Sequence, residues 1–128
     1  MQINLVDLVL GIRSGVLQAQ MSSYKTIFTS DVPSENKDLY STAVRFFQSL
    51  NDEQKPFVIF LVRQALCEAV SATLALLDGK WFIENQLKDF ELKFDGDEDR
   101  LNGDLMEIWW AIEEGADINE LRKFYERP

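Results

Sequence analysis

Histidine is absent from the 128 residues of this chain, and cysteine occurs only once, as Cys67. The lack of histidine excludes Ser-His-Asp and Cys-His nucleophile systems, zinc hydrolases with histidine ligands and histidine acid–base catalysis. One cysteine excludes an internal disulfide, which is typical of a reducing compartment. The sequence also has no glycine-rich phosphate-binding loop. Carboxylate-only chemistry, such as that of a divalent-metal carboxylate enzyme, survives these exclusions. We nevertheless expect no catalytic residues, no cofactor and a chain that is not an enzyme.

A secretory signal is not expected, because no basic residue precedes Arg13 and Asp7 interrupts the N-terminal apolar run. The most apolar window, residues 57–77, is long enough to span a bilayer. Three polar or charged residues lie near its middle, namely Arg63, Gln64 and Glu68. Charges at that depth are costly in a membrane. We interpret the window as the central helix of a soluble cytoplasmic protein, covered on most sides, with Cys67 buried and unreactive.

The net charge of −9 is distributed unevenly along the chain. Residues 1–83 contribute −1, whereas residues 84–128 contribute −8, from 14 acidic and 6 basic residues. Such an acidic segment repels the phosphates of nucleic acids and of anionic membranes, and it attracts a basic protein surface. A simpler interpretation is that the acidity only keeps the protein soluble.

The hydrophobic periodicity is mostly helical. It predicts a first helix over residues 3–28 with a broad apolar surface, and a second helix that follows Ser34 as N-cap. The pattern of residues 51–54 predicts a capping box for the central helix, and two short helices follow between residues 104 and 127. We expect a mainly α fold, one compact bundle of five or six helices that forms a single domain over residues 1–128. We also expect the first two-thirds of the chain to supply most of its interior.

One segment departs from the helical pattern. Phe90, Leu92 and Phe94 alternate with charged residues, which is typical of a short strand with one buried face. Residues 81–83 could pair with it, and turn signals occur at Asp95-Gly96 and Asn102-Gly103. The sequence therefore predicts a short β-hairpin or extended excursion near residues 81–102.

Asp95, Asp97 and Asp99 alternate as the first ligands of a calcium-binding EF-hand loop do. The sixth position of such a loop must be glycine and the twelfth must be glutamate, but Arg100 and Met106 occupy them here. These two departures exclude an EF-hand, and we predict an acidic, solvated turn without a metal site. Weak divalent-ion binding by the three aspartates stays open.

The late helix carries a candidate binding surface. Leu105, Ile108 and Ile112 share one side of it, and Trp110 points away from them. A tryptophan surrounded by acids is typical of an interface hot spot for a basic partner. The predicted partner-binding residues are Trp110, Glu107, Glu114, Asp104, Asp97 and Asp99. The alternative interpretation is that the terminal helix covers Trp110, which would then not be available to a partner.

Two functions follow from these patterns. The first is a non-enzymatic protein-binding module whose acidic C-terminal surface docks a basic partner, with a homodimer through the same face as its rival. In size, acidity and lack of nucleophile systems the chain resembles small bacterial proteins that neutralise a toxin or regulate a partner. This resemblance is general. No shared motif supports it, and it assigns no role to any residue of this chain. The second is a helical domain that binds a small apolar or cationic ligand between its helices, through Glu68, Arg63 and Gln64.

Overall fold

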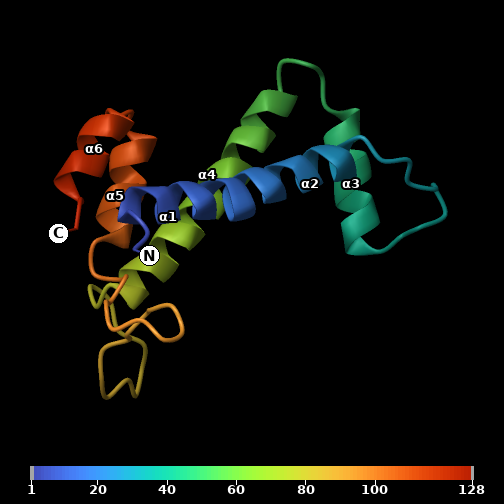
Figure 1. Cartoon of the computed structure of the whole chain (residues 1–128). Helices are drawn as coiled ribbons and strands as arrows, with labels where there is room; N and C mark the ends of the chain where they lie inside the picture. Colours follow the sequence, from blue (N-terminus) through green and yellow to red (C-terminus); the bar gives the residue numbers. More distant parts are fainter. Residues whose placement is uncertain (1, 128) are drawn as a thin grey trace.

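The computed structural model describes residues 2–127, and it is mainly helical, as predicted (Figure 1). The helical segments are α1 (Leu5–Ile12), the π-helix η1 (Arg13–Gln18), α2 (Ala19–Phe28), α3 (Leu39–Ser49), α4 (Lys55–Leu77), α5 (Leu105–Glu113) and α6 (Ile118–Phe124). The first three segments follow one another without a break and form one long rod. This rod is the helix that the sequence predicted over residues 3–28.

The rod begins at Asn4, whose side-chain oxygen accepts a hydrogen bond from the backbone N–H of Val6 at 2.9 Å. Gly11 and Gly15 do not serve close helix packing, since a Cβ atom added at either position would meet nothing within 4 Å. Instead, the helix widens into the π-helical segment η1 in the same region. A π-helical segment changes which residues face the neighbouring helix, and such segments are frequent at functional sites.

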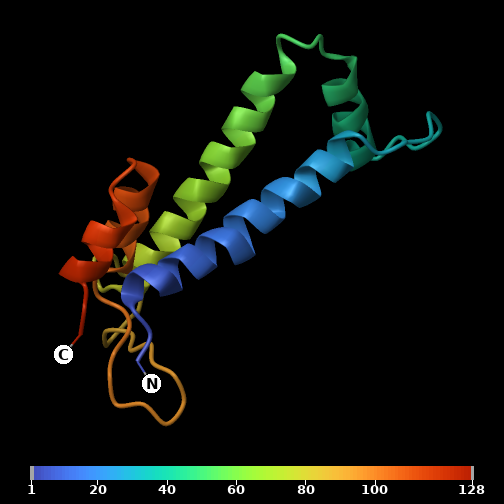
Figure 2. The ribbon, with the colours of Figure 1, turned by 45° about the horizontal axis from the view of Figure 1, so that its top comes forward.

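The rod and α4 diverge from one end of the molecule, and α3 lies between their far ends (Figure 2). The end where they meet also holds α5, α6 and both chain termini (Figures 1 and 2). At the far end, the Phe28 ring of α2 stacks on the Phe47 ring of α3, with 4.0 Å between their centres. The apolar core is therefore concentrated where α1, α4, α5 and α6 come together.

The buried core draws on both ends of the sequence. Its members are Leu5, Val6, Val9, Leu17, Cys67, Leu74, Leu101, Leu105, Ile108 and Trp109. Six of the ten belong to the first two-thirds of the chain, as expected, but the three largest fully buried side chains, Trp109, Leu105 and Ile108, belong to the last third. The reason is that α5 is apolar around much of its surface and packs against both α1 and α4.

Helix α4 is less covered than the sequence predicted. Only 17% of its most apolar 18-residue window is buried. The neighbouring helices cover only the C-terminal half of α4, which holds the buried residues Cys67, Ser71 and Leu74. Phe57, Phe60 and Leu61, in the other half, are mostly exposed. Within residues 2–127, α4 is the one helix whose length and composition would allow it to cross a membrane, a criterion that core helices also meet.

The predicted capping box before α4 is confirmed. The side chain of Asn51 accepts from the backbone N–H of Gln54 at 2.9 Å, and the Gln54 side chain accepts from the N–H of Asn51 at 3.1 Å. The N-cap predicted at Ser34 is wrong, because α3 begins only at Leu39. Asp38 caps it by accepting from the N–H of Ser41 at 2.9 Å.

The predicted β-hairpin is wrong, since no strand occurs in the part of the chain that the structure describes. The segment has no regular secondary structure, and its hydrogen bonds run to Leu101 and Asn102 in place of a partner strand. The backbone N–H of Leu101 donates to the carbonyl of Leu92 at 2.7 Å. Asn102 Oδ1 accepts from the N–H of Leu92 at 2.7 Å, and Asn102 Nδ2 donates to the carbonyls of Phe90, at 2.9 Å, and Leu77. Gly96 and Gly103 have positive φ values of 84° and 137°, in agreement with the turns predicted at Asp95-Gly96 and Asn102-Gly103.

Asp78, the residue that follows α4, caps the start of α5. Its two carboxylate oxygens accept from the backbone N–H groups of Gly103 at 2.6 Å and of Met106 at 2.7 Å. Asp78 and Asn102 are both buried. Together they fix the two ends of the irregular segment between α4 and α5.

Candidate functional site

The sequence placed Trp110 at the centre of a binding surface, and the structure places this side chain against α4. Its indole Nε1 donates a hydrogen bond to Ser71 Oγ at 2.6 Å, and the residue is half-buried. The ring is therefore engaged within the fold.

The acidic side chains near Trp110 are partly paired. Glu107 accepts a hydrogen bond from Lys80 Nζ at 3.1 Å, and this bond raises the pKa of the Lys80 ammonium. Asp104 and Glu114 are exposed and form no ion pair with a described residue. The candidate surface on α5 thus keeps only part of the negative charge that the sequence suggested.

The acidic loop, defined here as residues 81–104, carries more unpaired charge than α5. It contains eight acidic and three basic residues, a net charge of −5. Asp97 and Asp99 are exposed on it, and Asp99 accepts a hydrogen bond from Gln2 Nε2. Among residues 2–127, the loop carboxylates take part in one ion pair, between Glu91 and Lys93 at 3.9 Å. Most of the loop's negative charge is therefore available to another molecule.

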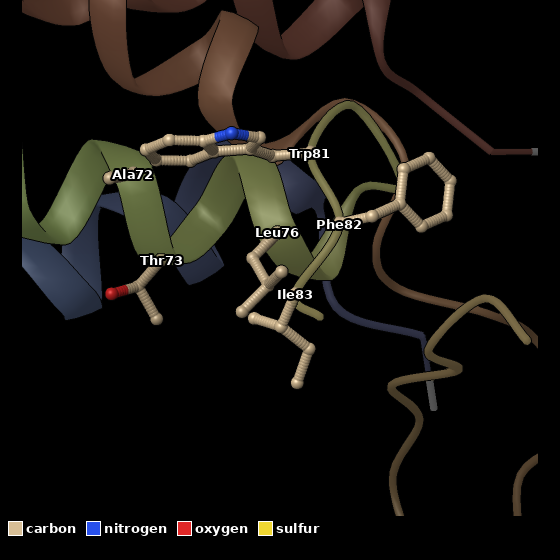
Figure 3. A pocket seen from close by; sticks show the side chains of 6 residues that line it. All are labelled: Ala72, Thr73, Leu76, Trp81, Phe82 and Ile83. Carbon is tan, nitrogen blue, oxygen red and sulfur yellow. The ribbon is translucent and has the colours of Figure 1, made fainter. Parts of the chain in front are cut away.

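An apolar hollow of about 330 Å³ lies where the acidic loop leaves α4. Its lining residues are Ala72, Thr73, Leu76, Trp81, Phe82 and Ile83. Figure 3 shows the Trp81 ring along α4 beside Ala72, whereas Phe82 points away from the other side chains. Trp81, Phe82 and Ile83 are each more than half exposed. The sequence predicts a strand at these three residues, and this pattern does not indicate an exposed surface there.

A second cluster links the rod, α4 and α5 through Glu113. Arg63 Nη1 lies 2.7 Å from Glu113 Oε1, and Arg13 Nη2 lies 2.7 Å from Glu113 Oε2. The Arg13 guanidinium also stacks over the Trp109 ring, 4.7 Å from its centre. The hydrogen bonds from Arg63 and then Arg13 outweigh the effect of burial and hold the pKa of Glu113 at about 2.

The cationic groove beside this cluster lies between the rod and α4, and its volume is about 380 Å³. Its lining residues are Arg13, Leu17, Gln18, Met21, Ser22, Lys25, Ile59 and Arg63. Of the three residues proposed for a ligand pocket, only Arg63 lines this groove. Gln64 donates instead to Glu68 at 3.1 Å, and Glu68 is exposed.

Arg13, Lys25 and Glu113 are not among the predicted site residues, although the sequence holds a signal for the first two. No acidic residue occurs in residues 8–30 or in residues 54–67, whereas four basic residues do. Two helical segments without acids in an acidic protein indicate a shared positive surface if they face one another. Nothing in the sequence indicated that Glu113 would join them.

Cys67 is buried, as predicted, and burial raises the pKa of its thiol. Within residues 2–127, no three acidic or cysteine side chains gather as a metal site would require. No protein-family model matches the chain, and neither the curated proteins nor the solved structures contain a significant match to it.

Proposed function

We propose that this chain is a non-enzymatic protein-binding module and that its acidic loop docks a basic protein. The observation that supports this function is the apolar hollow at Trp81, which lies at the start of a loop whose carboxylates are mostly unpaired. Protein interfaces commonly combine an aromatic anchor at a hollow with a charged surround.

The two parts of this surface would have different roles. The carboxylates would steer a basic partner toward the loop and so increase the association rate, an effect that salt weakens. The hollow would receive an apolar side chain of the partner and slow its dissociation. The partner would therefore present lysine or arginine around an apolar residue, as the basic target of an immunity-type or regulatory protein would.

The proposed surface differs from the one predicted on α5. Trp110 donates to Ser71 and Glu107 pairs with Lys80, so these two residues are partly engaged within the fold. Asp97, Asp99 and Asp104 remain in the proposed surface, whereas Glu114 lies at the opposite end of α5 from the loop. The loop's negative charge would repel nucleic acids and anionic membranes.

The test is affinity capture at low salt, followed by measurement of binding rates to each captured protein. We expect Trp81→Ala to increase the dissociation rate at least about tenfold, as loss of a hot-spot anchor does. Neutralising Glu84, Asp95, Asp97 and Glu98 as amides should slow association and reduce its salt dependence. Phe60→Ala is the matched control, because Phe60 is similarly exposed on α4. Equal capture by Trp81→Ala and Phe60→Ala would contradict the proposal.

The same surface could instead form a homodimer. Sedimentation at two salt concentrations distinguishes a homodimer from a complex with a basic partner. Two acidic loops repel each other, so self-association through them would strengthen as salt rises. Binding of a basic partner would weaken as salt rises. Dimerisation that increases with salt and is abolished by Trp81→Ala would replace the proposed function with self-association.

A further inference from the structure

The cationic groove has a charge opposite to that of the whole protein. Arg13, Lys25 and Arg63 line it, and Glu113 is the carboxylate that contacts two of them. These four groups leave a net charge of +2 at the groove. Because residues 8–30 and 54–67 contain no acid, the two walls add no further carboxylate.

Three polar side chains in the groove are free to bind another molecule. Lys25 forms no ion pair with a described residue, and the side chains of Gln18 and Ser22 form no hydrogen bond with one. Lys25, Gln18 and Ser22 are exposed along α2 and the end of η1. Each can donate a hydrogen bond to an anion.

The two arginines are held in place before any ligand arrives. Glu113 accepts from both, and Trp109 lies under the Arg13 guanidinium. A guanidinium that is already fixed loses little conformational entropy when it binds a carboxylate. The Glu113 cluster would thus orient the cations as well as reduce their charge.

The remaining lining of the groove is apolar and comes from Leu17, Met21 and Ile59. Its volume of about 380 Å³ falls within the range of small-molecule sites. We propose that the cationic groove binds a small organic carboxylate, with the charged end near Lys25 and the arginines and an apolar body against Leu17, Met21 and Ile59. This assignment changes the ligand class expected from the sequence, because three cations repel a cationic ligand.

The proposal does not depend on the acidic loop. The groove is lined by residues of the rod and the first half of α4, whereas the hollow at Trp81 is lined by the C-terminal half of α4 and residues 81–83. Variants of one site can therefore be tested without changing the other.

Calorimetry with the intact protein at low ionic strength tests the proposal, with octanoate as the probe. Octan-1-ol has the apolar body without the charge, and acetate has the charge without the body. We expect octanoate to bind at least about tenfold more tightly than either compound. Added salt should weaken octanoate binding, since charge contributes to it. The Met21 methyl resonance should shift on addition of octanoate.

Lys25→Glu is the decisive variant, because Lys25 is exposed and its replacement should leave the fold intact. Lys37→Glu makes the same charge change at an exposed residue outside the groove. We expect Lys25→Glu to weaken octanoate binding at least about tenfold and Lys37→Glu less than about twofold. Absence of octanoate binding at about 5 mM, equal binding of octan-1-ol, or equal effects of the two variants would each overturn the proposal. None of these outcomes bears on partner capture through the acidic loop.

Discussion

Arg63 donates to both carboxylate oxygens of Glu113, at 2.7 Å and 3.2 Å, and thereby joins the middle of α4 to the last residue of α5. Arg13 of η1 donates to the same carboxylate at 2.7 Å. One acidic side chain thus connects three helical segments that are far apart in the sequence. Its removal leaves two arginines beside each other without a counter-charge.

We expect Glu113→Gln to lower the free energy of unfolding by about 2 kcal/mol, because the amide replaces charge-assisted hydrogen bonds and leaves the two guanidinium groups to repel each other. Urea unfolding curves measure this change. Glu114→Gln is the control, since Glu114 is exposed and unpaired among the described residues, and it should change stability by less than about 0.5 kcal/mol. Equal effects of the two substitutions would show that the cluster does not support the fold.

The contribution of Glu113 should depend on pH with a defined sign. Folding lowers the pKa of this carboxyl from 4.5 to about 2. A lowered pKa stabilises the folded state fully above the unfolded value, and the stabilisation is lost as pH falls through the folded value. The stability difference between the natural chain and Glu113→Gln should therefore be constant near neutral pH and shrink between pH 4.5 and about 2. A difference that does not change over this range would contradict the assigned pKa.

We expect Asn102→Asp to destabilise the fold by about 2 kcal/mol, because it removes the two hydrogen bonds donated by Nδ2 and places a carboxylate beside two carbonyls. The bond from the Leu92 N–H can remain, since an aspartate oxygen also accepts it. Hydrogen exchange of the Leu92 amide, together with urea unfolding, separates these effects. Asn36→Asp is the control at an exposed position, and it should leave stability nearly unchanged.

The hydrogen bond between Trp110 and Ser71 should be measurable by a double-mutant cycle. Trp110→Phe and Ser71→Ala each remove one partner of a bond that is 2.6 Å long. We expect a coupling energy of about 1 kcal/mol, as for a neutral hydrogen bond in a half-buried site. A coupling energy near zero would show that the hydrogen bond does not hold the Trp110 ring, which would then be available to a binding partner.

Cys67 should react slowly with thiol reagents in the folded protein. The side chain is buried, and burial raises the pKa of its thiol, so little thiolate forms and reagents reach it only after opening of the structure. We expect modification at least about a hundredfold slower than in urea-unfolded protein. The absorbance of a released aromatic thiol follows the reaction. Rapid modification of the folded chain would show that the C-terminal half of α4 opens readily.

Helices were predictable because their causes are local, although the N-cap expected at Ser34 lies at Asp38 instead. The capping box of Asn51 and Gln54 and the long first helix follow from residues that are close in the sequence. The prediction of a β-hairpin was wrong for a physical reason. The alternation at Phe90, Leu92 and Phe94 predicts an extended chain but does not specify its hydrogen-bond partner. The Asn102 side chain supplies that partner through a contact that no local pattern encodes.

The candidate sites were less predictable than the helices. Arg63 could be singled out as a charge within an apolar helix, but its pairing with Glu113 depends on how α5 packs against α4. Trp110 was assigned to a surface from its angle on an isolated helix, a calculation that does not include Ser71 on the neighbouring helix. The single-domain assignment, the cytoplasmic location and the basic partner remain predictions.

The anchoring of the loop by Asp78 and Asn102 has an evolutionary consequence. These two buried side chains secure both ends of the excursion, and Asn102 also holds the backbone at Phe90 and Leu92, so residues 84–89 and 93–99 contribute little to the stability of the fold. Substitutions, insertions or deletions there could retune recognition of a changing target while the helical scaffold stays the same.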